Sequence, residues 1–421
     1  MGIKKKQKKC IINKIFTILI ILVIPFFIGL KIVEINKSDI FSQSFITYME
    51  ILFVALTISL AYNIIVLVKN KRLIPSKKTF AIVTMFLLFV IFEITGSIKL
   101  VYYNDDFKDW IIKTSIGSIN YKYVATNIYN EQTIETVMNR AYRDMPLEDL
   151  SSDIVTYDDL TYNKVHYKNE FEEQILKHDE GQDYKIIKIS GKTIGANYHY
   201  EGYMAVIYNP AKVKIAKSRG AKSTPGGYGQ TLETIYRESH AKLAMNAGGF
   251  YDPHWNSNGG QPHGAVIIDG KIDSNYTRGI GSGGLIGFTK DNKLVLKRMT
   301  AQEAIDSGIR DAVDWGPYLI VNGRNQFSHI KSYTWTCQRT AIGQRKDGIV
   351  LMLVIDGLQK HSKGASYADV AQIMQKYGAI NAASLDSGTS TSMIAKGKYI
   401  NKPWNGYVPT YRRLPNAWIV E

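Results

Sequence analysis

Two short stretches of the sequence carry the tripeptide Asp-Ser-Gly, which suggests acid–base chemistry by carboxylates. One runs from Asp306 to Gly308, and the other runs from Asp386 to Gly388 within LDSGTSTSM. Aspartic proteases place two aspartates on tight loops that follow strands, where the carboxyl groups face each other and share one proton. The protease interpretation therefore requires both copies to lie in that setting.

Only the second copy has suitable surroundings. AINAASLD predicts a buried strand that ends at Asp386, and a glycine-containing turn follows it. Asp306 instead lies in TAQEAIDSG, where Thr300 and Glu303 match a capping box and Gly308 marks the end of a helix. We therefore expect Asp306 to be a surface acid. This excludes a two-lobed protease and leaves only a dimer with one copy in each chain.

Other catalytic and metal-binding motifs do not occur. The sequence has no GxSxG, no HExxH, no EF-hand loop and no CxxC or Cys/His zinc spacing. Its two cysteines, Cys10 and Cys337, are predicted on opposite sides of a membrane, so they cannot pair. We expect no cofactor and no metal site from these patterns, although the Asp-rich loops leave a divalent cation open.

Polar residues gather in four Gly- and Asn-rich segments that end or bridge predicted strands. The segments are residues 245–264, 315–323, 339–357 and 385–393. Glycine allows the backbone to approach a ligand, and loops at strand ends commonly carry function. The candidate residues in these segments are Asn246, Gly249, His263, Arg339, Asp356, Asp386 and Ser390.

The elements that position these residues are short strands and a few helices. KIIKISG and EGYMAVIYNP predict strands, and AVIIDGKI, GFTKDNKLVL and TAIGQRKDGIVLMLVIDG predict hairpins. GIVLMLVI is apolar throughout, which predicts burial on both faces. SYADVAQIMQKYG predicts a helix capped by Ser366 and Asp369 and closed by Gly378. Residues 184–421 are therefore expected to form an α+β domain of hairpins and buried strands with flanking helices.

Three apolar runs precede this domain, at residues 11–33, 45–68 and 80–103. Each covers roughly 20 residues, enough to cross a bilayer. KKKQKK precedes the first run and KNKRLIPSKK follows the second, so the positive-inside rule places the N-terminus in the cytoplasm and everything after Tyr103 outside. Residues 1–103 are thus expected to be three transmembrane helices in the cell membrane. Residues 104–183 are expected to be a polar stalk with a helix at EQTIETVMNRAY.

The distribution of charge argues against nucleic-acid binding. Of the formal net charge of +15, residues 1–79 carry +10, from 13 Lys and Arg against 3 Asp and Glu. This excess flanks apolar segments and therefore indicates membrane topology.

The ordered motifs resemble the phosphodiester glycosidase family, whose bacterial members are often labelled exopolysaccharide-related. The chain has NAGGFY, RTAIG, DGLQ, a helix and LDSGTS in the family's order, and YRRLPNAWIV matches its closing strand at Arg412. The resemblance covers roughly residues 184–421. NAGGFY is one residue longer than the family's motif, and Ser387 and Thr389 replace glycines.

The resemblance implies cleavage between a sugar's anomeric carbon and a phosphodiester oxygen. Phosphate is a good leaving group, so the reaction needs a cationic clamp and a carboxylate at the anomeric centre. Asp386 and Asp356 are predicted as the base or nucleophile and the orienting or acid group, with His263 as a proton carrier. Predicted substrate contacts come from Arg339, Asn246, Ser390, Arg412 and Gly249.

Each of these residues also has a structural interpretation. Arg339 and Arg412 could form salt bridges within the protein, and Asp356 and Ser390 could stabilise turns. His263 could be an exposed loop residue.

The predicted function is that of a membrane-anchored, extracytoplasmic glycosidase acting on sugar-1-phosphodiesters in cell-envelope or exopolysaccharide glycans. The alternative is a non-catalytic glycan-binding or exopolysaccharide assembly protein on the same fold. Both interpretations predict a glycan or sugar-phosphate ligand and a membrane as partners.

Overall fold

The computed structural model describes residues 41–51, 54, 101, 104–116, 122–143, 166–252, 257–276, 284–329, 336–405 and 407–421. The chain divides into two compact units, one of residues 1–112 and 123–136 and the other of residues 113–122 and 137–421. The predicted apolar run at 11–33, and most of the runs at 45–68 and 80–103, lie outside the described residues. Within the described part, no helix has both the length and the apolar character needed to cross a membrane.

Helices make up the described segments that precede the sheets. They are α4 (Asp105–Ile116), α5 (Lys122–Ile128), α6 (Glu131–Arg143) and α7 (Glu170–Leu176). Helix α6 confirms the helix predicted at EQTIETVMNRAY, with Ile134 buried as its spacing indicates. Helix α7 is capped by Asn169, and its Ile175 carbonyl accepts a hydrogen bond of 2.8 Å from the Tyr208 hydroxyl.

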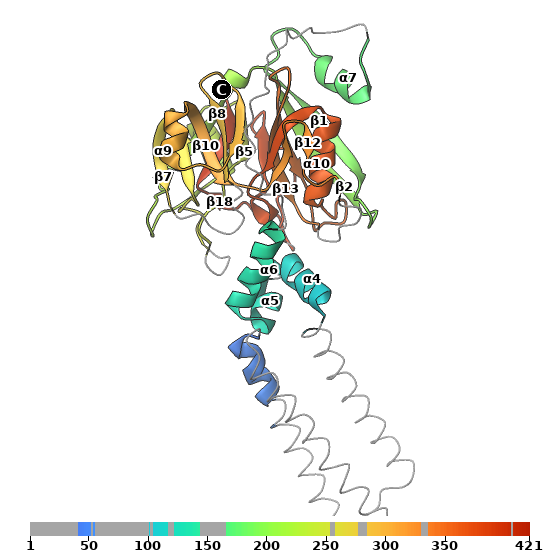
Figure 1. Ribbon diagram of the computed structural model, residues 1–421, viewed down its shortest axis with the longest axis vertical. Coiled ribbons are helices and arrows are strands. Elements are labelled where there is room, and N and C mark those ends of the chain that lie inside the picture. The colour runs from blue at the N-terminus through green and yellow to red at the C-terminus, as the bar shows by residue number, and fades with distance from the viewer. Residues whose placement is uncertain are drawn as a thin grey trace, which may run out of the picture. The chain divides into compact units, whose positions relative to one another are not determined.

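A seven-stranded antiparallel sheet, in the order β1-β2-β14-β13-β15-β11-β12, carries Arg339, Asp356 and Asp386 at one end. Helix α10 (Tyr367–Lys376) packs on β11, β13 and β15 (Figure 1). Strand β14 is buried along its whole length, as its sequence predicts. The strands are β1 (Tyr184–Lys192), β2 (His199–Ile207), β11 (Tyr318–Val321), β12 (Arg324–Asn325), β13 (Arg339–Arg345), β14 (Val350–Ile355) and β15 (Ala379–Ser384).

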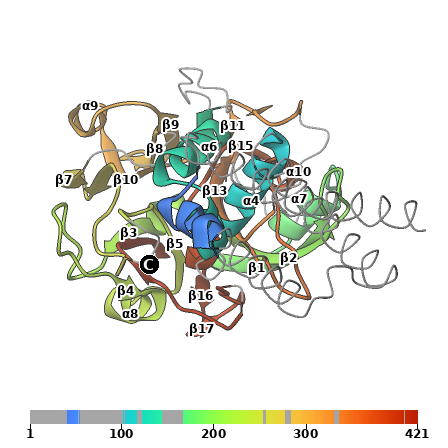
Figure 2. The ribbon, with the colours of Figure 1, turned by 90° about the horizontal axis from the view of Figure 1, so that it is seen from below.

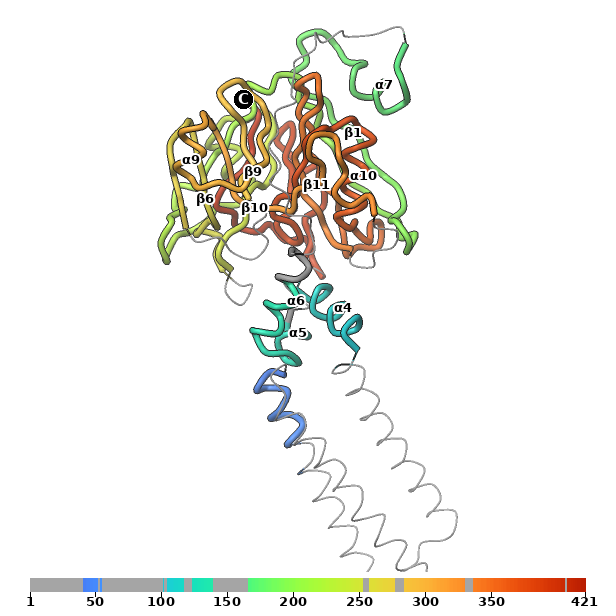
Figure 3. The backbone as a smooth tube through the Cα atoms, in the orientation of Figure 1, coloured from blue at the N-terminus to red at the C-terminus, as the bar shows by residue number. Residues whose placement is uncertain are grey.

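Two five-stranded sheets complete the domain. The first has the strand order β7-β6-β10-β8-β9 and lies beside helix α9 (Ala301–Asp306) (Figure 3). Its strands are β6 (Ala265–Ile268), β7 (Lys271–Asn275), β8 (Gly284–Thr289), β9 (Leu294–Lys297) and β10 (Ile309–Trp315). The second has the strand order β17-β16-β5-β19-β3. Its strands are β3 (Val213–Lys217), β5 (Leu243–Asn246), β16 (Met393–Ala395), β17 (Lys398–Tyr399) and β19 (Asn416–Val420).

The second of these sheets joins segments that are far apart in the sequence. Figure 2 shows β3 and β5 beside the C-terminal strands, with helix α8 (Leu232–Glu238) against them. A small ribbon pairs β4 (Gln230–Thr231) with β18 (Arg413–Leu414). Short 3₁₀ turns occur at η2 (Pro210–Lys212) and η4 (Gly388–Ser390).

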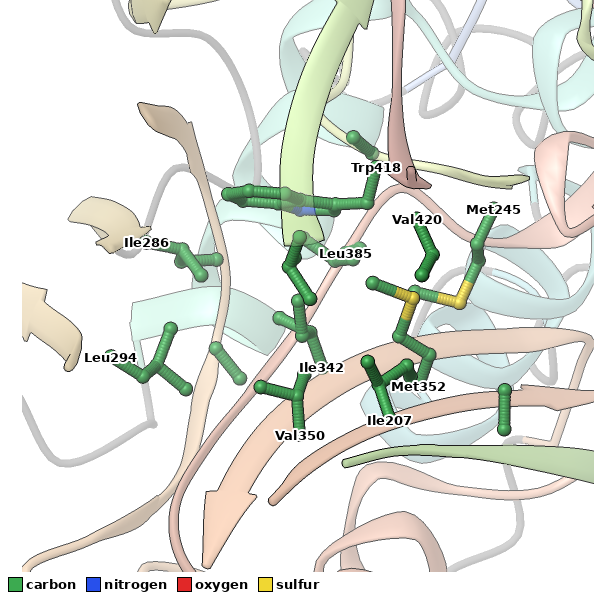
Figure 4. Packing of buried hydrophobic residues seen from close by; sticks show 14 of the residues in the cluster. Ile207, Met245, Ile286, Leu294, Ile342, Val350, Met352, Leu385, Trp418 and Val420 are labelled. Carbon is green, nitrogen blue, oxygen red and sulfur yellow. The ribbon is translucent and has the colours of Figure 1, made fainter. Parts of the chain in front are cut away.

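All three large sheets contribute to one hydrophobic core. Met352 and Ile342 come from the seven-stranded sheet, Ile286 from β8, and Met245 and Trp418 from β5 and β19 (Figure 4). Because the three sheets share these contacts, the loops at their ends are held by a single packed interior.

The local predictions around this core are confirmed. Ser366 and Asp369 form a capping box at α10, and Thr300 and Glu303 form one at α9. Asp306 is exposed at the end of α9, so the first Asp-Ser-Gly copy is a surface feature, as predicted.

Candidate functional site

Asp386 lies two residues beyond the end of β15, on a loop that is tied to the end of β5. Its backbone N–H donates to the Ala247 carbonyl at 3.0 Å, and its carbonyl accepts from Asn246 Nδ2 at 2.6 Å. The chain then turns through Gly388, whose φ of +63° is a conformation that favours glycine. The carboxyl group is therefore held in a fixed position by neighbouring backbone.

Asn246 is the residue that joins these loops. It is fully buried, and its Oδ1 accepts from the Thr340 hydroxyl at 2.9 Å and from the Ser392 N–H at 3.0 Å. The Thr340 hydroxyl also lies 3.1 Å from the Thr391 hydroxyl. Asn246 thus connects strand β13 with the Asp386 loop and has no exposed surface, and its predicted contact with substrate stays a prediction.

The carboxylate of Asp386 is only partly engaged. Oδ1 accepts from the Ser387 N–H at 3.1 Å, whereas the buried Oδ2 has no hydrogen-bond partner within the described part of the chain. Burial raises the pKa of Asp386 to about 6, while the Ser390 side chain and the positive charge of Arg412 oppose this shift. An acid of this kind changes its protonation state near neutral pH.

Arg412 and Asp252 supply the charges next to this acid. The Arg412 guanidinium pairs with the Asp252 carboxylate and lies over the Phe250 ring, 4.7 Å from its centroid. The Asp252 charge raises the pKa of Asp386. Arg412 therefore has the predicted salt bridge and also lies close enough to Asp386 to affect its ionisation.

Asp252 was not predicted from the sequence. It follows NAGGFY directly, in the same Gly- and Asn-rich segment as the predicted Asn246. Its Oδ1 accepts from the Ser257 N–H at 2.6 Å, which fixes the loop. The Gly- and Asn-rich composition indicated the loop that carries Asp252. The pairing of Asp252 with Arg412, 160 residues away, could not be predicted from neighbouring residues.

His263 lies among three aromatic rings, one from its own loop and two from the ends of β7 and β10. Its ring centroid is 6.1 Å from that of Tyr251, 6.5 Å from that of Tyr276 and 6.3 Å from that of Trp315. Tyr251 precedes Asp252, so His263 lies near one side of the charged pair. Its predicted role in proton transfer stays a prediction. Trp255, the other aromatic of this loop, lies outside the described residues.

Gly249 is required by packing within the protein. A Cβ atom at this position would lie 1.9 Å from Cζ3 of Trp315. The indole ring therefore occupies the space that a side chain at this position would need, and the predicted substrate contact of Gly249 stays a prediction.

Arg339, Asp356 and Asp386 converge at one end of the seven-stranded sheet. Strand β13 begins at Arg339 and pairs antiparallel with both β14, which ends before Asp356, and β15. The strand order therefore brings the three together at this end of the sheet. Their side chains nevertheless face different surroundings.

The buried Arg339 guanidinium stacks on Tyr367, 3.9 Å from the ring centroid, and its Nε donates to the Ala365 carbonyl at 2.9 Å. These contacts fix the start of α10. Only 2% of the residue is exposed, so its phosphate-binding role stays a prediction that this geometry does not favour.

Asp356 has both carboxylate oxygens engaged. Oδ1 accepts from Asn401 Nδ2 at 3.2 Å and from the Lys402 N–H at 2.9 Å, and Oδ2 lies 2.9 Å from His361 Nε2. The residue is 2% exposed. This arrangement agrees with the structural interpretation of Asp356 more closely than with a catalytic one, because both oxygens already have partners within the protein and the residue is almost fully buried.

Ser390 is buried in the η4 turn and acts on the site through Asp386. Within the ranges that the structure describes, no three His, Cys, Asp or Glu side chains are grouped so that they could hold a metal ion. The residues that meet at the site are therefore Asp386, Ser390, Arg412 and Asp252, with His263 and Tyr251 beside them.

Comparisons with known proteins bear on the same segment. Residues 239–421 match the model of the phosphodiester glycosidase family, which confirms the resemblance drawn from the ordered motifs. The chain is 26% identical over 237 residues to the SPbeta prophage-derived uncharacterized protein YomE of Bacillus subtilis, covering 54% of this chain and 35% of that protein. It is 27% identical over 210 residues to human N-acetylglucosamine-1-phosphodiester alpha-N-acetylglucosaminidase, covering 42% and 38%.

The chain thus spans less than half the length of these curated relatives. Among solved structures, the catalytic domain of the zebrafish N-acetylglucosamine-1-phosphodiester alpha-N-acetylglucosaminidase matches with a TM-score of 0.47 at 19% identity, over 58% of this chain and 85% of that one.

Proposed function

We propose that the phosphodiester glycosidase domain at residues 239–421 hydrolyses the bond between a sugar's anomeric carbon and a phosphodiester oxygen. The observation that carries this proposal is Asp386, a fixed carboxyl group with a pKa of about 6 and an unengaged Oδ2 beside a cation. The family match of the surrounding segment and the names of the curated relatives support the same chemistry.

In the proposed reaction, the bond from C1 of the sugar to the phosphate oxygen breaks. Water supplies a hydroxyl group to C1 and a proton to the solution or the leaving group, so the products are a free sugar and a phosphomonoester. Ionised Asp386 acts at the anomeric centre, either on C1 directly or on the incoming water. Arg412 offers guanidinium N–H groups to the departing phosphate, and its pairing with Asp252 fixes the orientation of the guanidinium.

We further propose that this domain is anchored in the cell membrane and acts outside the cytoplasm on envelope or exopolysaccharide glycans. The support is the three apolar runs before residue 104, with their basic flanks at residues 4–9 and 69–78. Residues 104–183 then form the stalk of the proposed arrangement.

The test is hydrolysis of N-acetylglucosamine 1-(methyl phosphate) by the full chain in water enriched in ¹⁸O, with glucose and galactose counterparts. Mass spectrometry locates the label. We expect ¹⁸O in the free sugar and none in methyl phosphate, since the C–O bond breaks. Label in the phosphate would indicate attack at phosphorus and overturn the glycosidase assignment. Absence of both products for all three sugars, with binding retained, would favour a non-catalytic glycan-binding protein.

A further inference from the structure

The segment that delivers Arg412 to the site also presents side chains on its outer surface. Along residues 411–414 exposure alternates, with Tyr411 and Arg413 exposed, Arg412 partly buried and Leu414 buried. Strand β18 within this segment pairs with β4, with Arg413 opposite Thr231. This alternation of exposure places Tyr411 and Arg413 on the outer face of the segment whose inner face carries Arg412.

The guanidinium of Arg413 stacks on a second exposed tyrosine, Tyr228. Its Cζ lies 4.4 Å from the ring centroid of Tyr228, and its Nη1 donates to the Gly229 carbonyl at 3.1 Å. No carboxylate of the described chain pairs with Arg413. Tyr228 is 49% exposed even though its backbone N–H is bonded to the Gly220 carbonyl at 2.8 Å. The pair thus offers an aromatic surface and a cation with guanidinium N–H groups left for an anion.

Tyr411 is held in a similar way. Its ring lies 4.5 Å from that of Tyr399, which belongs to β17, yet the residue remains 51% exposed. Both tyrosines are therefore ordered by protein contacts while they face solvent. Preordered aromatic side chains bind ligands at a low entropic cost. We refer to Tyr228, Tyr411 and Arg413 as the tyrosine–arginine ridge.

The ridge and the candidate site lie on the two faces of one short segment. Arg412 lies between Tyr411 and Arg413 in the chain and pairs with Asp252 on the inner face. Units of a polymer that extend from Asp386 past the edge of this segment would therefore meet the ridge on its outer face. The ridge combines aromatic faces, which pack on the C–H faces of sugar rings, with a cation that suits phosphate.

We propose that the tyrosine–arginine ridge binds repeat units of the polymer that extend beyond the cleaved bond, so that the substrate is an anionic polymer of sugars joined by phosphodiesters. This inference rests on the proposed function of the Asp386 site and names its substrate class. Sugar rings of the polymer pack on Tyr228 and Tyr411, and Arg413 binds a bridging phosphate.

The test measures binding, so that it does not depend on turnover. The probe is a trimer of N-acetylglucosamine units joined by 1,6-phosphodiesters, titrated calorimetrically into full chain that carries Asp386→Asn. We expect Tyr411→Ala, Tyr228→Ala and Arg413→Gln each to raise the Kd for the trimer about tenfold or more, as for side chains at the centre of a binding contact. Tyr198→Ala is the matched control, because Tyr198 is 48% exposed in the turn between β1 and β2.

Two outcomes would overturn the ridge proposal. One is a Kd for the trimer that is the same in the ridge variants as in the Tyr198→Ala control. The other is equally tight binding of neutral chitotriose, which would remove the role of phosphate. In catalytically intact chain, the ridge variants should raise KM for the trimer and leave hydrolysis of N-acetylglucosamine 1-(methyl phosphate) unchanged. If the wild type hydrolyses neither substrate but its binding of the trimer still depends on the ridge residues, the proposed function is overturned and the ridge proposal stands.

Discussion

Replacing Asp386 by Asn should make the folded chain more stable at neutral pH. Burial raises the pKa of this carboxyl group from 3.8 to about 6, so the folded state favours the protonated, neutral form. The shift of about two pKa units corresponds to about 3 kcal/mol. Asn resembles the neutral acid in shape and carries no charge at any pH, and therefore avoids this cost.

The sign follows from proton binding. Because the pKa of Asp386 is higher in the folded chain than in the unfolded chain, the folded state holds more protons between about pH 4 and pH 6. The free energy of unfolding of the wild type therefore falls as the pH rises through this window. Above it, ionised Asp386 costs the fold up to about 3 kcal/mol, and below it the cost vanishes.

The assay is urea denaturation of the full chain at a series of pH values from 4 to 8. We expect Asp386→Asn to match the wild type near pH 4 and to exceed its stability by up to about 3 kcal/mol near pH 7.5. Asp306→Asn is the matched control, since it alters an exposed acid in the same tripeptide and should follow the wild type. A difference between Asp386→Asn and wild type that does not change with pH would refute the reasoning.

Three further substitutions test the surroundings of the acid. Gly249→Ala should lower the melting temperature, because the new Cβ meets Trp315, and overpacking of this kind costs about 1–3 kcal/mol. Adding Trp315→Ala should remove the part of the loss that is due to the clash. A Gly249→Ala protein as stable as the wild type would contradict the packing. Asp356→Ala should lower the free energy of unfolding by about 3 kcal/mol, because it leaves buried donors without their acceptor, whereas a change near zero would contradict the structural role. Arg412→Met should raise the pKa of Asp386 further, since the Arg412 charge lowers it, and the acidic limb of the pH–activity profile should therefore move to higher pH. An acidic limb at the wild-type pH would contradict the electrostatic contact between Arg412 and Asp386.

The parts of the fold that the sequence predicted are those with local causes. The capping boxes at Thr300 and Ser366 and the Asp269-Gly270 hairpin depend on residues within a few positions of one another. Asp386 was also found locally, as the polar residue after a buried strand. The same context separated it from Asp306, whose Asp-Ser-Gly lies at the end of a helix.

The arrangement of the sheets and the partners within the site could not be predicted in this way. Strand β19 pairs with both β3 and β5, which are far away in the sequence. Asn246 joins its loop to Thr340 and Asp386, and Arg412 finds Asp252, through contacts that span 94 to 160 residues. Type and spacing along the chain do not specify such partners, because tertiary packing selects them.

The most direct test of the central claim is the rate at which the full chain releases free sugar from N-acetylglucosamine 1-(methyl phosphate), compared between wild type, Asp386→Asn and Asp306→Asn. We predict that Asp306→Asn retains the wild-type rate and that Asp386→Asn loses at least about a thousandfold, because it removes the carboxylate that acts at the anomeric centre. The wild-type rate should also fall by half near pH 6 as Asp386 gains its proton. Sugar release that is undiminished in Asp386→Asn would contradict the account.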